Sequence, residues 1–218
     1  MSRLLKSLGG FGILGLLLLL PSRAAHAATI TFNFDVCGAS TNTGLSNVSC
    51  GATSTYTVGG YSITATADPA GRDNLLFAKN GGAGSGEQGL GLTSDGSGQD
   101  EITPGHFIQL DVSSIIGNDP LSIIMNSTTG GETWRVVETN MAGTMAGATF
   151  EASGMNELAF TINPGDKYLD VTETTEGGNI LLSSLSFTTA TTPEPSSLVL
   201  LGSGMLGLAG AVRRKLKA

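Results

Sequence analysis

Four acidic side chains in a glycine- and serine-rich stretch are the best candidates for binding a metal ion: Glu87, Asp95, Asp100 and Glu101. Hard oxygen ligands on a flexible loop suit Ca²⁺, which takes about six to eight of them. Asp35 or Asp170, from expected strands whose positions the sequence does not fix, could add further ligands. The spacing does not match the EF-hand loop pattern. The residues thus define a candidate Ca²⁺ site, with a solvated acidic loop as the alternative interpretation.

Two arrangements could support catalysis. A Ser-His-Asp site in the mature region would have to use His106, but no Gly-x-Ser-x-Gly elbow occurs, and the preceding Pro104-Gly105 favours a surface turn. Paired carboxylates are abundant: Glu132 and Glu138 bracket Trp134, and an aromatic ring can stack on a sugar. No pair stands out among so many acids. We therefore expect no enzymatic activity, and keep a carbohydrate-active hydrolase as the alternative function.

The Gly-rich segment Gly81–Gly91 could suggest a phosphate cradle. It lacks the Gly-Lys-Ser/Thr ending of a P-loop and the strand-turn-helix context of a dinucleotide fold. We expect it to be a long surface loop.

Cys37 and Cys50 are the two cysteines of the chain. In an oxidising compartment outside the cytoplasm they are expected to form a disulfide. Zinc is a poor alternative, because two thiols do not fill its four-coordinate shell and no paired His is available. The disulfide would close a loop of about 14 residues and contribute roughly 3 kcal/mol to stability.

Charge is distributed unevenly along the 218 residues, which contain 11 Lys and Arg against 18 Asp and Glu. Seven of the basic residues lie at the two ends, whereas Glu194 is the one acid outside residues 28–192. Residues 28–192 therefore carry a net charge of 4 − 17 = −13. Binding to nucleic acid is not expected, because neutralising phosphates needs a basic face.

Residues 28–192 show the apolar-polar alternation of half-buried strands, interrupted by turn signals such as Gly59-Gly60. About eight to ten strands predict an all-β domain, an antiparallel two-layer β-sandwich of jelly-roll-like type. Trp134 alternates with Val136 and is expected in the core. The expected strands lie at 30–36, 61–67, 74–78, 108–112, 121–125, 132–139, 158–162, 167–172 and 180–188, with a weaker candidate at 144–151.

Residues 1–27 have the features of a helical secretory signal peptide. Arg3 and Lys6 precede an apolar run from Leu8 to Leu20, and Ala25-His26-Ala27 supplies the small-x-small cleavage pattern. Signal peptidase is thus expected to cut so that the mature chain begins at Ala28. An uncleaved anchor helix is the alternative, although the apolar run is shorter than the span of about 20 residues that a membrane needs.

The C-terminal region contains three elements in order. Pro193-Glu194-Pro195 is followed by an apolar segment, 198–212, and then by basic residues. The apolar segment predicts a short transmembrane anchor helix, with residues 28–192 outside and the basic tail in the cytoplasm. A permanent single-span anchor is one interpretation of this pattern. The basic tail consists of Arg213, Arg214, Lys215 and Lys217.

This combination closely resembles the PEP-CTERM sorting signal of Gram-negative bacteria, over residues 193–218. The resemblance implies an inner-membrane intermediate, processing near Pro-Glu-Pro by an exosortase-type transpeptidase or protease, and delivery to the surface or extracellular matrix of biofilm-forming bacteria. The stretch 86–92 (GEQGLGL), followed by Asp100-Glu101-Ile102, is similar to a group of exported PEP-CTERM proteins. We therefore expect a non-enzymatic surface or matrix protein, associated with exopolysaccharide and binding glycan weakly.

Overall fold

The structure is a computed structural model of the chain. It describes residues 27–67, 74–82, 86–93, 98–118, 120–128, 131–189 and 195–215. Residues Ala28–Thr189 form one compact unit. The C-terminal segment contains one described helix, α2 (Pro195–Lys215). The expected signal peptide lies outside the described residues except for Ala27.

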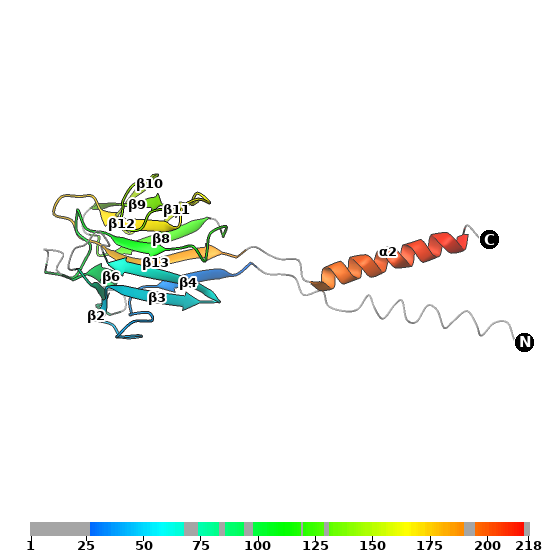
Figure 1. Cartoon of the computed structure of the whole chain (residues 1–218), viewed down its shortest axis with the longest axis horizontal. Coiled ribbons are helices and arrows are strands. Elements are labelled where there is room, and N and C mark those ends of the chain that lie inside the picture. The colour runs from blue at the N-terminus through cyan, green and yellow to red at the C-terminus, as the bar shows by residue number, and fades with distance from the viewer. Residues whose placement is uncertain are drawn as a thin grey trace, which may run out of the picture. The chain divides into compact units, whose positions relative to one another are not determined.

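The compact unit consists of two antiparallel sheets packed face to face (Figure 1). Sheet A has the strand order β11-β8-β13-β6-β5-β2, and β1 pairs with the second half of β13. Sheet B has the order β10-β9-β12-β7-β4-β3. The chain crosses between the sheets repeatedly, for example from β7 to β8 and from β12 to β13, so the expected jelly-roll-like sandwich is confirmed.

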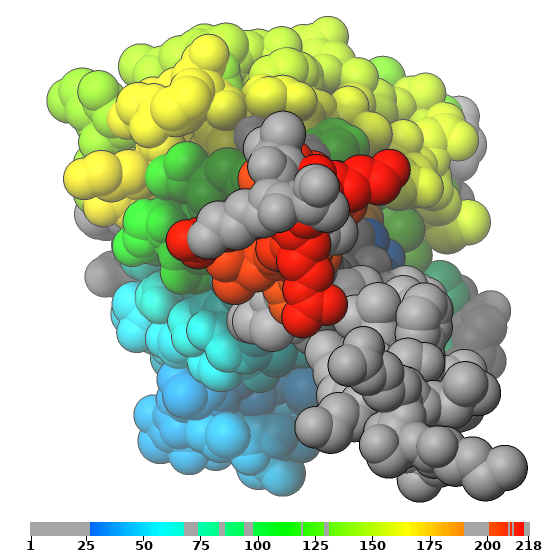
Figure 2. All heavy atoms as spheres, turned by 90° about the vertical axis from the view of Figure 1, so that its right-hand side faces the viewer, coloured from blue at the N-terminus to red at the C-terminus, as the bar shows by residue number. Residues whose placement is uncertain are grey.

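The strands of sheet A are β1 (Thr29–Asn33), β2 (Val48–Gly51), β5 (Leu76–Asn80), β6 (Gln88–Leu92), β8 (Leu121–Asn126), β11 (Leu158–Phe160) and β13 (Leu181–Thr188). The strands of sheet B are β3 (Thr53–Val58), β4 (Tyr61–Ala67), β7 (Ile108–Asp111), β9 (Thr133–Thr139), β10 (Thr149–Ser153) and β12 (Tyr168–Glu173). In Figure 2, the blue-to-cyan segment that contains β2, β3 and β4 and the yellow-green segment that contains β9, β10 and β12 lie at opposite edges of the sandwich.

Alternating side chains build the core between the sheets. In β8, Leu121, Ile123 and Met125 are buried, and the residues between them are more exposed. Burying an aliphatic side chain of this size contributes about 1.5–3 kcal/mol. Trp134 of β9 is fully buried and donates from Nε1 to the carbonyl oxygen of Gly154 at 2.9 Å. Its expected position in the core is therefore confirmed.

The expectation of a surface loop over Gly81–Gly91 is wrong in its second half. Strand β6 lies inside sheet A between β5 and β13, with Leu90 and Leu92 in the core. A Cβ at Gly89 would lie 2.5 Å from the Leu182 carbonyl oxygen, and one at Gly91 only 2.0 Å from that of Asp100. Glycine is required because neighbouring backbone approaches this closely.

The two ends of the compact unit meet. Ala28 N donates to Thr189 Oγ1 at 3.1 Å, and Thr189 N donates to the Ala28 carbonyl oxygen at 2.8 Å. Strands β1 and β13 continue this pairing from Thr29–Thr188 onward and lie side by side in Figure 1. The sandwich is thus closed by hydrogen bonds between its own first and last residues.

Candidate functional site

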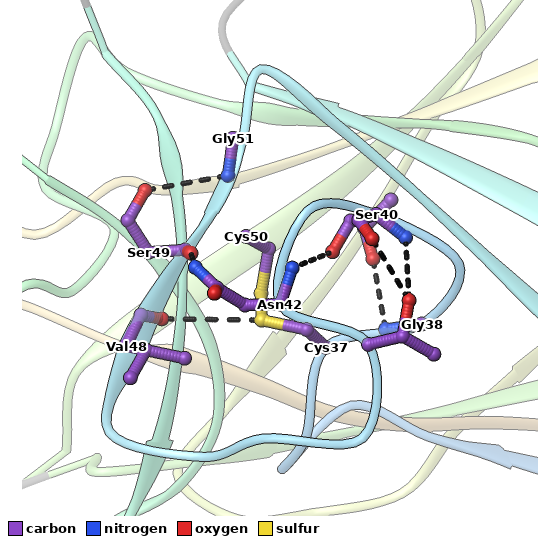
Figure 3. Close-up of a disulfide and its surroundings, with 10 residues drawn as sticks. Cys37, Gly38, Ser40, Asn42, Val48, Ser49, Cys50 and Gly51 are labelled. Atoms are coloured by element: carbon purple, nitrogen blue, oxygen red, sulfur yellow. Dashed lines mark hydrogen bonds between the residues drawn. A yellow bond between two sulfur atoms is a disulfide. The ribbon is translucent and has the colours of Figure 1, made fainter.

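The predicted disulfide between Cys37 and Cys50 is confirmed, with Cα atoms 5.3 Å apart (Figure 3). Both cysteines are buried at the side of the sandwich where β2 runs into β3. The disulfide fixes the neighbouring residues against β3, where Ala39 N donates to the Thr55 carbonyl oxygen at 2.6 Å. Part of the open edge of sheet B is thereby covered, which limits its pairing with other chains.

The loop closed by the disulfide is tied down internally (Figure 3). Asn42 Nδ2 donates to the Ser49 carbonyl oxygen at 2.6 Å, and Cys37 N donates to that of Leu45 at 2.8 Å. Between this loop and β3 lies an open groove of about 320 Å³. Its lining includes the polar residues Asn33, Thr43, Thr55 and Thr57 and the aromatic residues Phe32 and Tyr56.

Two of the four candidate calcium ligands, Glu87 and Glu101, lie together, and both form ion pairs with the ammonium group of Lys79. The Nζ atom of Lys79 (β5) is 2.6 Å from Glu87 Oε2 and 2.5 Å from Glu101 Oε1. Ser127 Oγ lies within hydrogen-bond distance of both carboxylates, 3.0 Å from Glu87 and 2.9 Å from Glu101, and its one hydrogen is shared between them. Residues distant in sequence thus converge on the outer face of sheet A, joining the GEQGLGL stretch to the Asp-Glu-Ile segment.

Burial and the ion pairs together shift the pKa values of Glu101, Glu87 and Lys79 in different directions. Burial raises the pKa of Glu101, whose side chain is completely covered, although the hydrogen bond from Lys79 opposes this effect. The hydrogen bond from Lys79 lowers the pKa of Glu87. Burial alone would lower the pKa of Lys79, but its bonds to Glu101 and Glu87 raise it. The lysine therefore stays charged and supplies the cation that these carboxylates need.

The geometry around Lys79 bears on both chemical hypotheses. Among the described residues, no three His, Cys, Asp or Glu side chains lie close enough together to hold a metal ion. Asp95 lies outside the described residues, and Asp100 has a left-handed backbone (φ 60°). The four-residue calcium site stays a prediction. For a hydrolase, the Glu87–Glu101 pair is a poor candidate, because an ammonium group bridges the two carboxylates and Glu101 is fully buried.

The other residues considered for catalysis have structural partners. Glu138 accepts from the backbone N of Asn163 at 2.9 Å and from its side-chain amide. Trp134, which lies between Glu132 and Glu138 in the sequence, is fully buried in the core. The hypothesis that its ring stacks on a sugar is therefore wrong. His106 is half-buried just after the Pro104-Gly105 turn, with Nδ1 2.8 Å from Asn74 Nδ2.

One unusual carboxylate was suggested by sequence only as an extra calcium ligand. Asp170 of β12 is fully buried, and its Oδ1 accepts from Gln109 Nε2 at 2.7 Å. Its Oδ2 has no hydrogen-bond partner in the described part of the chain. Burial raises the pKa of Asp170 to about 7. The sequence signal is the alternation of β12, which places Leu169 and Val171 in the core and Asp170 on the other face.

The C-terminal segment forms a helix, α2, that begins at Pro195 and ends at Lys215. Proline is well suited to the first helical position, and the basic Arg213, Arg214 and Lys215 complement the dipole in the last turn. Pro193, Glu194 and Lys217 lie outside the described residues. Over the residues that the structure describes, no helix is long and apolar enough to cross a membrane. The span expected at 198–212 is therefore not confirmed; glycine and serine interrupt its leucine-rich sequence.

A family model described as the PEP-CTERM protein-sorting motif matches residues 191–215. The chain therefore carries a PEP-CTERM protein-sorting motif. The PEP-CTERM motif indicates exosortase-type sorting of an exported surface protein, as the resemblance of residues 193–218 to this sorting signal implies. No curated protein and no solved structure matches the chain.

Proposed function

We propose that this PEP-CTERM protein is a surface or extracellular-matrix component that is cut at both ends and works in the exopolysaccharide layer as a folded β-sandwich. The observation that carries the proposal is the position of the sorting motif. The compact unit ends at Thr189, and the motif begins at residue 191. Removal of the C-terminal segment would therefore cost the sandwich none of its strands.

The N-terminal boundary supports the same proposal. Ala28, the expected first residue of the mature chain, already hydrogen-bonds to Thr189 through its backbone N and O atoms. Cleavage by signal peptidase after Ala27 leaves this pairing intact and frees an amino group at the edge of the fold. The Cys37–Cys50 disulfide suits an oxidising compartment, where such bonds form and persist.

Mutation of the sorting motif tests the route. In a host that has an exosortase-type system, replacing Pro193, Glu194 and Pro195 with Ala should leave the chain in the inner-membrane fraction and remove it from the surface and medium. The matched control replaces Ser196 and Ser197 with Ala and should be sorted normally. Equal surface delivery of both variants would contradict sorting through this motif.

Weak glycan binding is the finer part of the proposal, and the groove beside the disulfide supports it. A volume of about 320 Å³ reaches the lower end of the range for small-molecule sites. Thr43, Thr57 and Asn33 are among its lining residues, and hydroxyl and amide groups are the kinds of group that hydrogen-bond sugars. Because residues 28–192 carry a charge of −13, we expect neutral or amino-sugar polymers to bind better than acidic ones.

A pull-down with insoluble polysaccharides of neutral, cationic and acidic type tests this part separately. We expect weak retention on neutral or cationic polymer, and its loss when Thr43 and Thr57 are both replaced with Ala. Thr31→Ala, an exposed hydroxyl on β1, is the control. Retention on none of the polymers, or equal retention of both variants, would contradict the glycan role and leave the sorting role standing.

A further inference from the structure

The outer face of sheet B contains a group of polar side chains that are sealed from water. Because Leu169 and Val171 point into the core, Asp170 between them faces away from sheet A. Gln109 lies opposite Asp170 in the register of β7 and β12. Asp170 is nevertheless 0% exposed and Gln109 only 3%. Some other part of the chain must cover this face.

Residues 140–148, which connect β9 to β10, contact this face and are called the cover loop. Gln109 Nε2 lies 3.4 Å from the Met141 carbonyl oxygen, and Gly143 N donates to Gln109 Oε1 at 3.1 Å. At its far end this cover loop returns to the sheet, where Glu138 N donates to the Ala148 carbonyl oxygen at 2.9 Å. Gln109 therefore joins the cover loop on one side to Asp170 on the other.

The cover loop is held by few strong contacts. It consists of small or flexible residues, Asn140-Met141-Ala142-Gly143-Thr144-Met145-Ala146-Gly147-Ala148, and all nine are exposed or half-buried. Met141 is 57% exposed, so its side chain adds little burial. A segment with few buried apolar contacts opens at a lower free energy than the core strands do.

Asp170 has little to stabilise its charged form. Its one described hydrogen bond comes from the neutral amide of Gln109, and Oδ2 has none. The titratable or charged residues that share the outer face nearby are Tyr168 on β12, Asp111 on β7, Arg135 on β9 and Glu151 on β10; the cover loop has none. No hydrogen bond or ion pair is found between any of these four and Asp170 among the described residues. A buried carboxylate in such a place is costly, and contact with water relieves the cost.

We propose that residues 140–148 form a pH-sensitive cover, closed over Asp170 in acid and opening as the surroundings approach neutrality. The proposal uses the export proposed above only to place this sandwich where external pH reaches it. Exposed to water, Asp170 titrates near its ordinary pKa of 3.8, whereas under the cover burial raises the pKa to about 7. The closed state binds more protons between these values, so the opening constant should rise about tenfold per pH unit from about pH 4 to 7 and then level off.

Hydrogen exchange read by mass spectrometry on the whole, disulfide-bonded chain tests the cover. After correction for the intrinsic effect of pH on exchange, peptides spanning 140–148 should lose protection about tenfold per unit between about pH 5 and 7. Peptides from β4 and β12 should change much less. Asp170→Asn should remove the dependence, and Glu176→Gln, at an exposed carboxylate, should keep it.

A second variant keeps the proposal testable if Asp170→Asn does not fold. Gln109→Ala removes the link between Asp170 and the cover loop, so the loop should be poorly protected even in acid while the core peptides stay protected. Three results would overturn the proposal: protection of the loop that does not vary with pH, an unchanged pH dependence in Asp170→Asn, or equal changes in the loop and the core strands.

Discussion

Removing the Cys37–Cys50 disulfide should measurably destabilise the sandwich. The cysteines are separated by 13 positions and close a loop of 14 residues. In the chain-entropy model, ΔS is −2.1 − 1.5R ln 14, or about −10 cal/mol/K, which corresponds to about 3 kcal/mol at 25 °C. We therefore expect Cys37→Ala/Cys50→Ala to lower the free energy of unfolding by about this amount.

The size of the fold converts this loss into a shift in melting temperature. The compact unit Ala28–Thr189 has 162 residues (189 − 28 + 1). At about 2.1 cal/mol/K per residue its unfolding entropy is about 340 cal/mol/K, so a loss of 3 kcal/mol lowers the melting temperature by about 9 °C. Fluorescence of the buried Trp134, the one tryptophan of the chain, reports the unfolding of the core.

Reduction of the unmodified chain is the matched control, because it breaks the bond and keeps both sulfur atoms in place. If the entropy of the closed loop dominates, the reduced chain and the double variant should melt within a few degrees of each other. A combined loss below about 1 kcal/mol would refute this reasoning. A large loss in the variant with none on reduction would assign the effect to packing of the buried cysteines instead.

Further predictions concern the glycines and the charged cluster of sheet A. Gly91→Ala should lower the free energy of unfolding, measured in urea, by at least about 2 kcal/mol, because its Cβ would lie 2.0 Å from a carbonyl oxygen. The control Gly165→Ala places its Cβ in open space and should change stability by less than about 0.5 kcal/mol. Equal effects of the two variants would contradict the close backbone approach at Gly91. Lys79→Met should lower the free energy of unfolding by about 2–3 kcal/mol at pH 7, which is less than for a fully buried ion pair because Lys79 is partly exposed. The loss should be smaller near pH 4, because burial raises the pKa of Glu101 and the carboxyl group is then protonated. A loss of stability that does not vary with pH would contradict this charge argument. If Glu87, Asp95, Asp100 and Glu101 bind Ca²⁺, the melting temperature should be higher in millimolar Ca²⁺ than in EDTA. Equal melting temperatures would contradict the calcium site.

The fold class could be predicted because inward-facing side chains alternate in strands such as β8. Strand β6 could not be recognised, because Gly89 and Gly91 have no side chains to show the alternation. Edge strand β3 was hidden for a different reason: it is a run of Thr and Ser residues around one buried tyrosine, Tyr56. Its position depends on pairing with β4 and with Ala39.

The charged cluster could be predicted in part. The sequence groups Glu87 and Glu101 as two of four candidate Ca²⁺ ligands, and the structure brings these two carboxylates to one point. The cation in the structure is Lys79, which sequence reasoning had not connected with them, because the contact needs β5 and β6 to pair in their observed register. The burial of Asp170 likewise depends on a loop that crosses the outer face of sheet B, and local sequence gives no sign of that.

Mass spectrometry of the protein recovered from the cell surface and medium tests the central claim most directly. We expect a terminal peptide that begins at Ala28, an intact Cys37–Cys50 bond, and no peptide from the chain beyond the Pro193-Glu194-Pro195 motif. A surface protein that retains Met1 or its C-terminal Ala218 would contradict processing at that end.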